Sequence, residues 1–224
     1  MSADKNRQPN PLWALWYRAG YAADRLLKTG QRRAEFEHKY AAHGDYFGYR
    51  TDPYELKKYA DTLSCVLEWR RGASAVLEIG CSVGMFTAML APRFEKVVAS
   101  DIAQQALALA SAQVGEARNV SFVRGDLLEL DLKQKFDVVI CAEMLMYIRE
   151  GDGRRVCEVL ERHLAPNGLV VEVAPRDRAS NAKFFLGWNR VLGAYFHEAF
   201  RLVVDDANRP YEIVAYDLRS HAVT

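Results

Sequence analysis

The sequence has no long hydrophobic segment and almost no net charge. Its most apolar N-terminal stretch, residues 12–27, is interrupted by Arg18, Asp24 and Arg25, so it is too polar to span a membrane. The stretch also lacks a small-residue cleavage site, which argues against a secretory signal peptide. The formal net charge of +1 provides no field that would attract nucleic acid. We therefore expect neither a membrane span nor a nucleic-acid partner.

Cysteine is also scarce. The four cysteines, at positions 65, 81, 141 and 157, show no Cys-x-x-Cys spacing and no histidine pair lies near them. This pattern favours buried thiols in a reducing cytoplasm over a disulfide framework or a zinc site. No resident metal is predicted, although acids gathered at one edge of a sheet could hold a divalent cation.

What the sequence does contain is a regular alternation of strand-like and helix-like segments. Half of its 224 residues are apolar and 26% are charged, which is typical of one globular unit. Strands are predicted at residues 75–79, 96–100, 120–124, 136–141 and 168–174, helices at 54–69, 102–114, 154–164 and 180–196, and a final hairpin at 200–204 and 211–217. This order predicts a three-layer α/β fold with seven strands, mostly parallel, that ends in an antiparallel hairpin.

The first 70 residues are predicted to form helices and a flap beside a core at residues 71–224, within one globular unit. Residues 12–27 have the spacing of an amphipathic helix. This helix would pack on its own domain, cover a substrate cleft, anchor at a membrane surface or contact a second copy in a homodimer. Residues 31–40 are predicted to form an exposed helix, and 43–53 a loop rich in glycine, aspartate and aromatic residues.

A glycine-bearing turn follows the first predicted strand. Gly80 and Gly84 lie in this turn, and Asp101 ends the next strand 21 residues after Gly80. An acid at about this distance is placed to accept hydrogen bonds from a ribose. Ser82 stands where dinucleotide folds have their middle glycine, which disfavours a pyrophosphate and hence an NAD-linked dehydrogenase. The turn by itself is also compatible with a purely structural role.

Polar residues follow each of the first five predicted strands. Gly80, Asp101, Asp126, Glu143 and Arg176 come directly or shortly after these strands in turn. Because the carboxyl ends of parallel strands meet at one edge of a sheet, we expect these residues to share a ligand site there.

These motifs carry a family resemblance. Glu78-x-Gly80-x-x-x-Gly84, Asp101, Gly125-Asp126-Leu127 and the strand 136–140 resemble, in order and spacing, the motifs of class I S-adenosylmethionine (SAM) methyltransferases with a Rossmann-like sheet. Residues 45–59 and 143–147 further resemble the NodS-like family, whose namesake N-methylates a deacetylated chitooligosaccharide. The chain departs from that pattern at Phe47, where the family usually has tryptophan.

The resemblance implies a set of cofactor contacts. The amino-acid part of SAM would lie against Gly80, Cys81 and Gly84, with Lys58 as a partner for its carboxylate unless Lys58 is simply an exposed helical lysine. Asp101 would bind the ribose hydroxyls, and Asp126 the adenine amino group. The remaining implied contacts are apolar or aromatic: Ile102 and Leu127 for adenine, Phe86 in the same site, and Tyr49, Phe47 and Tyr147 for the sulfonium.

The acceptor side is predicted from the same edge of the sheet. Glu143 is the candidate general base or acceptor ligand, with helix capping as its alternative role. His43 is a second candidate base, unless it is a surface residue. Tyr147, Arg176 and His197 are candidate substrate contacts, although the aromatic surroundings of His197 would also suit a core position.

The sequence thus predicts a cytoplasmic SAM-dependent methyltransferase that releases S-adenosyl-L-homocysteine. Its acceptor would be a nitrogen or hydroxyl of a small molecule, and the resemblance implies a sugar or oligosaccharide. The alternatives are a natural-product amine, hydroxyl or carboxylate methyltransferase and a non-catalytic SAM-binding protein. RNA and protein methyltransferases are disfavoured because the chain shows neither an added recognition domain nor a basic stripe.

Overall fold

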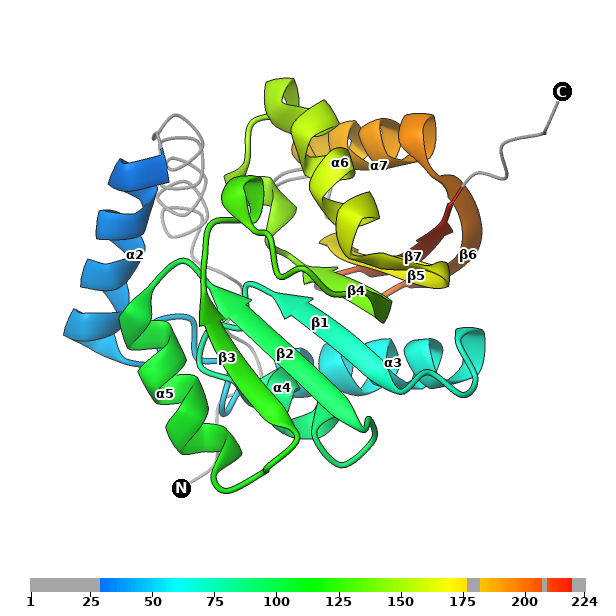
Figure 1. The fold of residues 1–224 in the computed structure, drawn as a ribbon. Helices are drawn as coiled ribbons and strands as arrows, with labels where there is room; N and C mark the ends of the chain where they lie inside the picture. Colours follow the sequence, from blue (N-terminus) through cyan, green and yellow to red (C-terminus); the bar gives the residue numbers. More distant parts are fainter. Residues whose placement is uncertain (1–28, 177–181, 207–208, 219–224) are drawn as a thin grey trace, which may run out of the picture.

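The computed structural model of the protein describes residues 29–176, 182–206 and 209–218 (Figure 1). The amphipathic helix predicted at residues 12–27 lies outside these ranges. Among the described residues, no helix is both long and apolar enough to cross a membrane.

The described residues form one sheet in the order β3-β2-β1-β4-β5-β7-β6. The first five strands are parallel, β7 is antiparallel to β5, and β6 is antiparallel to β7. The strands are β1 (Ala75–Ile79), β2 (Lys96–Asp101), β3 (Val120–Arg124), β4 (Phe136–Ala142), β5 (Leu164–Pro175), β6 (His197–Val204) and β7 (Tyr211–Asp217). The predicted fold class, including its terminal antiparallel hairpin, is confirmed.

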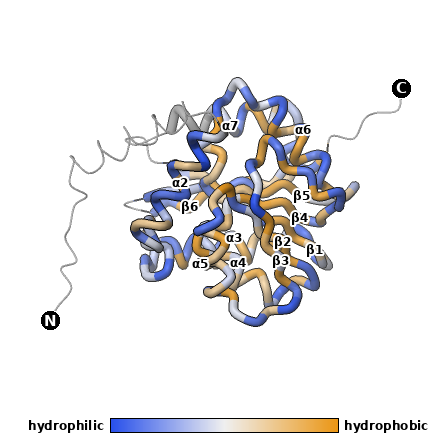
Figure 2. The backbone as a smooth tube through the Cα atoms, turned by 60° about the vertical axis from the view of Figure 1, so that its left-hand side comes forward, coloured by the Kyte–Doolittle hydropathy of each residue, from blue (hydrophilic) through white to orange (hydrophobic). Residues whose placement is uncertain are grey.

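Helices cover both faces of the sheet (Figure 1). They are α2 (Thr29–His43), α3 (Pro53–Trp69), α4 (Met85–Leu90), α5 (Gln104–Val114), α6 (Gly153–His163) and α7 (Ala182–Tyr195), with 3₁₀ turns η1 (Leu127–Glu129), η2 (Leu145–Tyr147) and η3 (Glu150–Asp152). Val138 and Ile140 of β4 pack with the α3 and α4 side chains, whereas Val139 and Cys141 pack with those of α6 and α7. A strand buried on both faces must be apolar throughout, and Figure 2 shows the central strands as hydrophobic segments.

Helix α3 begins where local chemistry favours a helix start. Asp52 precedes α3 in an extended conformation and accepts the N–H of Tyr54 at 2.9 Å, while Pro53 takes the first helical position. The predicted division at residue 70 falls on the residue that caps the other end of α3; a separate N-terminal part stays a prediction.

The expectation that residues 31–40 form an exposed helix is wrong in one respect. They are helical, as part of α2, but Arg32, Phe36 and Tyr40 are buried. The three residues recur every fourth position and therefore share one face. This face packs against Val83 and Ala103 in the loops after β1 and β2.

Candidate functional site

A cavity of about 660 Å³, which includes part of its open mouth, lies at the carboxyl ends of β1 to β4. Eight of the predicted site residues line it: Tyr49, Gly80, Asp101, Ile102, Asp126, Leu127, Glu143 and Tyr147. Phe47 lines it as well, as do residues that were not predicted, among them Arg32, Phe36, Tyr40, Ser82 and Met144. Asp101 and Gly80 therefore face the same cavity, as a ribose site beside the glycine turn requires.

Asp101 is held by the loops around it. Its Oδ2 atom accepts the N–H of Ser82 at 3.0 Å, and its Oδ1 atom accepts the N–H of Ala103 at 2.9 Å. Burial raises the pKa of Asp101 to about 6, against the lowering effect of these N–H groups. A carboxylate has about four lone-pair positions, so each oxygen can accept one more hydrogen bond from a ligand in the cavity.

The two glycines of the turn have different roles. Gly80 has a φ of 80°, and a Cβ atom there would lie 3.0 Å from the Cβ of Met144 across the cavity wall. Gly84 does not line the cavity. A Cβ atom on Gly84 would lie 2.6 Å from the Cα of Ala110, so this glycine allows α4 and α5 to approach. The prediction of a cofactor contact at Gly84 is therefore corrected to a packing role.

Cys81 and Phe86 are buried beside the cavity but do not line it. The Phe86 ring stacks on Tyr59, with 5.2 Å between ring centroids, in the core below α3. Glu78 is also buried, and its Oε2 atom accepts the hydroxyl of Thr87 at 2.6 Å. Burial raises the pKa of Glu78 to about 8. The partner that a buried acid needs is here supplied by α4 rather than by a ligand.

Asp126 forms a buried ion pair that the sequence did not reveal. Its Oδ2 atom lies 2.7 Å from Nη2 of Arg32, while its Oδ1 atom accepts the N–H of Leu128 at 2.9 Å. Arg32 also donates from Nη1 to the carbonyl oxygen of Tyr147 at 3.0 Å. The guanidinium thus connects α2 with the loops after β3 and β4.

Lys58 and Glu143, which were predicted to contact the cofactor and the acceptor respectively, contact each other. The Nζ atom of Lys58 lies 2.7 Å from Oε2 of Glu143 and 2.7 Å from Oε2 of Glu55. Both contacts are ion pairs without hydrogen-bond alignment. Lys58 is only 2% exposed and does not line the cavity, so a direct contact with the cofactor carboxylate is not supported. Glu143 does line it, in a left-handed conformation (φ 51°) that non-glycine residues rarely adopt.

Aromatic rings form much of the cavity wall. Phe36 meets Tyr147 edge to face, with centroids 5.0 Å apart, and Phe47 stacks on Tyr49 at 5.2 Å. The Tyr40 hydroxyl lies 2.8 Å from the Ser82 hydroxyl and donates to it. Burial raises the pKa of Tyr40 well above its ordinary value, so Tyr40 stays a neutral donor.

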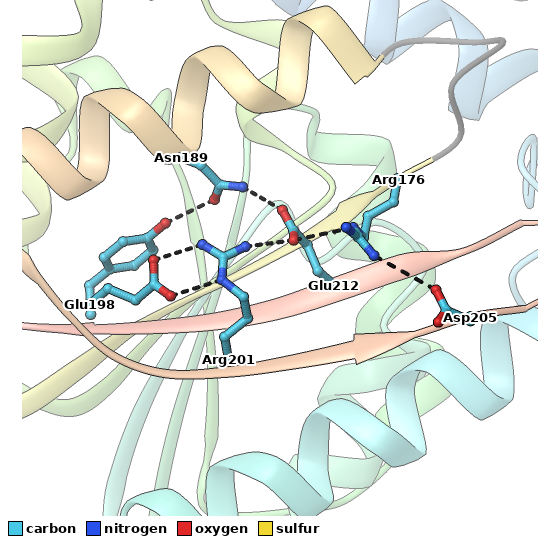
Figure 3. Close-up of polar contacts among 7 residues, drawn as sticks. Arg176, Asn189, Glu198, Arg201, Asp205 and Glu212 are labelled. Carbon is cyan, nitrogen blue, oxygen red and sulfur yellow. Dashed lines mark hydrogen bonds and ion pairs between the residues drawn. The ribbon is translucent and has the colours of Figure 1, made fainter.

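The predicted residues His43, Arg176 and His197 lie away from this cavity. His43 is exposed at the end of α2, with its ring 5.5 Å from Tyr46. Arg176 is 44% exposed and pairs with Glu212 at 3.5 Å and Asp205 at 3.7 Å (Figure 3). None of the three lines the cavity.

His197 requires a correction. It begins β6 and lies beside Asp217, level with the start of β5 at the opposite edge of the sheet. The physical reason is that β6 runs parallel to β1–β5, so its first residue falls at their amino ends.

The residues that sequence reasoning missed come mainly from α2. The signal was present in the spacing of Arg32, Phe36 and Tyr40, but the many charged residues between them indicate an exposed helix. Within the ranges that the structure describes, no group of three or more histidine, cysteine, aspartate or glutamate side chains could hold a metal ion.

Comparisons with known proteins place the chain in a family. The family described as Nodulation protein S (NodS) matches residues 32–204. Nodulation protein S of Bradyrhizobium diazoefficiens is 33% identical over 126 residues, 56% of each chain, and that of Rhizobium tropici is 30% identical over 144 residues, 64% of this chain and 58% of the relative. The chain thus spans just over half the length of these curated relatives.

Solved structures show the same fold. N-methyltransferase NodS from Bradyrhizobium japonicum WM9, in complex with S-adenosyl-L-homocysteine, superposes with a TM-score of 0.73 at 21% identity, over 84% of this chain and 98% of that one. Magnesium protoporphyrin IX methyltransferase from Synechocystis PCC 6803, with the same bound compound, gives 0.64 at 14% identity, over 83% and 99%.

Proposed function

Because the chain belongs to the Nodulation protein S family of class I SAM-dependent methyltransferases, we propose that it transfers a methyl group from SAM to the nitrogen of a small acceptor. The observation that carries the choice of nitrogen is the acidic cluster of Glu143, Lys58 and Glu55, in which Glu143 lines the cavity and the other two lie behind it.

The residues of the cavity fit the cofactor. Asp101 has lone pairs left for the ribose hydroxyls, and it lies beside Gly80, whose missing side chain leaves room against the backbone. Ile102 and Leu127 provide apolar surface for the adenine, next to Asp126. When bound, SAM supplies a methyl group on a positively charged sulfur. The rings of Tyr49 and Tyr147 suit such a cation.

The charge of the acidic cluster favours an amine. Two carboxylates share one ammonium group, and the further pair Arg209–Asp52, which reaches Glu55 at 3.5 Å, adds no net charge. The cluster therefore holds one more carboxylate than cations. Burial and the nearby Glu143 carboxylate both raise the pKa of Glu55, as excess negative charge predicts. A protonated amine at Glu143 would relieve this excess.

Glu143 then acts as the acceptor's base. An ammonium group has no lone pair, so it must lose a proton before its nitrogen can form a bond to the methyl carbon. The Glu143 carboxylate binds the ammonium and takes up this proton. Lys58 holds the Glu143 carboxylate from the buried side, at 2.7 Å from its Oε2 atom. The remaining acceleration comes from holding the nitrogen in line with the methyl group, which is worth roughly 7–11 kcal/mol in favourable cases.

We further propose an amino sugar or amino-oligosaccharide as the acceptor. The family relationship supports this class, since the two relatives compared above are named Nodulation protein S. The rings of Phe47, Tyr49 and Tyr147 add support, because they offer flat apolar surface on which a sugar ring can lie. The cytoplasm is the proposed location, in keeping with four free cysteines, and a homodimer through residues 12–27 stays a prediction.

An acceptor panel tests the proposal. Methyl incorporation from labelled SAM should occur with deacetylated chitooligosaccharides or amino sugars, and not with their N-acetylated or hydroxyl-only counterparts. Glu143→Gln should lower kcat by about 100-fold or more, because it removes the base, while the Kd for S-adenosyl-L-homocysteine stays within about threefold. Glu116→Gln, an exposed site without a described partner, is the matched control. Full turnover of Glu143→Gln, or preference for a hydroxyl acceptor, would contradict the proposal.

A further inference from the structure

The buried pair of Arg32 and Asp126 has unused hydrogen-bonding groups that point to a role beyond holding α2 in place. We propose that Arg32, held in place by Asp126, donates to a ring nitrogen of the cofactor's adenine, beside the amino group that the family resemblance assigns to Asp126. The inference rests on the proposed use of SAM, and it adds a base-specific contact from outside the sheet.

Contacts along α2 fix the position of the guanidinium. Glu37 accepts the N–H of Gln104 at 2.6 Å and so caps the start of α5, which has no side-chain cap of its own. One helical turn further, the Tyr40 hydroxyl bonds to Ser82. Arg32 lies nearer the start of the same helix. It is 6% exposed and lines the same cavity as Ile102 and Leu127.

Both partners keep free capacity. A guanidinium carries five N–H donors, and the described contacts of Arg32 use two, to Asp126 and to the Tyr147 carbonyl. A carboxylate can accept about four hydrogen bonds, and Asp126 accepts from Arg32 and from the Leu128 N–H. Free donors and free acceptors therefore lie side by side, fixed by the 2.7 Å bond that joins the two side chains.

This arrangement is complementary to adenine. Its exocyclic amino group is a donor with acceptor nitrogens on either side, N1 and N7. In hypoxanthine the amino group is replaced by an oxygen acceptor, which would face the Asp126 carboxylate. A mismatch in a water-excluded site leaves polar groups unpaired, so discrimination can be large.

Calorimetry of the full chain with cofactor analogues tests the inference. The ligands are S-adenosyl-L-homocysteine and its 1-deaza, 7-deaza and 6-oxo (inosyl) counterparts. The wild-type protein should bind the 6-oxo compound about 100-fold more weakly and one deaza compound roughly 10-fold more weakly. In Arg32→Ala, S-adenosyl-L-homocysteine should bind about 10-fold more weakly, and the extra loss with that deaza compound should disappear.

Two further variants separate base recognition from a structural effect. Glu37→Gln loosens α2 without touching the base, so it should weaken all four ligands by the same factor. Arg32→Lys keeps the charge but lacks the planar fork of donors, and it serves as the test variant if Arg32→Ala fails to fold. Equal losses for all ligands in the Arg32 variants, or unchanged affinity, would overturn the role of Arg32 while SAM binding stands. Absence of binding to the wild-type protein would instead overturn the cofactor assignment, and this inference with it.

Discussion

The two halves of the sheet each bury carboxylates, and Asp101 in the first half differs sharply from Glu172 in the second. In the first half Asp101 ends β2, and N–H groups from two loops approach both of its oxygens. In the second half Glu172 lies within β5, between Cys141 and Val214 of the neighbouring strands, and neither of its oxygens has a hydrogen-bond partner among the described residues. A strand end exposes spare backbone donors, whereas the N–H groups inside a sheet are used by its own ladder.

The difference shows in their protonation. Burial raises the pKa of Asp101 to about 6 and that of Glu172 to about 8, so near neutral pH the first is ionised and the second is largely protonated. Glu212 lies on the strand next to Glu172, and its carboxylate has partners for both oxygens. Arg201 lies 2.6 Å from the Oε2 atom, and Asn189 donates a hydrogen bond to the Oε1 atom (Figure 3). Asp101, unlike Glu172, is therefore an ionised acid that a ligand can contact.

Removing the Asp101 charge should have the largest effect. Asp101→Asn keeps the shape but loses the ionised acceptor, so we expect S-adenosyl-L-homocysteine to bind roughly 100-fold more weakly, as when a buried charged hydrogen bond is broken. Calorimetry measures this. The wild-type affinity should also increase as pH rises through about 6, because the ligand needs the ionised acid, while the affinity of the variant should not. Equal affinity of the two proteins at pH 8 would refute the ribose assignment.

The second-largest effect is expected from substituting Gly84, which lies at the end of the turn after β1. Gly84→Ala places a Cβ atom 2.6 Å from the Ala110 Cα at a φ of 77°, so we expect the free energy of unfolding to fall by about 2–3 kcal/mol. Urea unfolding measures the change. Gly72→Ala has the same φ but open space around it, and it should lose about 1 kcal/mol from backbone strain alone. Equal losses in the two variants would contradict the close packing of α4 and α5.

The smallest effect on ligand binding is expected from Glu172, whose charge affects stability between about pH 4.5 and 8. Its pKa is raised from an ordinary 4.5 to about 8, so the folded protein keeps a proton that the unfolded chain has lost. The stability of the wild-type protein should therefore fall as pH rises from about 4.5 to 8, relative to Glu172→Gln. By about pH 8.5 the variant should have gained stability relative to the wild type, compared with the difference between the two proteins at about pH 5. Parallel pH profiles would contradict this, and ligand affinity should not change.

The order of strands and helices followed from the sequence because hydrophobic periodicity is a local property. The β3 range agrees fully, β1 likewise, and the acids after β2 and β3 lie at the edge where parallel topology places them. Roles that depend on distant partners could not be predicted. Lys58 meets Glu143 only because α3 packs across β1 and β4.

The sequence alone thus determined the alternating elements, the glycine turn and the rim of polar residues, since each depends on neighbours within a few positions. Tertiary structure decided which charges are paired, that α2 turns Arg32 toward Asp126, and that His197 lies at the far edge of the sheet. Those outcomes depend on the packing of segments that are up to about a hundred residues apart. The type of a side chain does not indicate which distant residue it will contact.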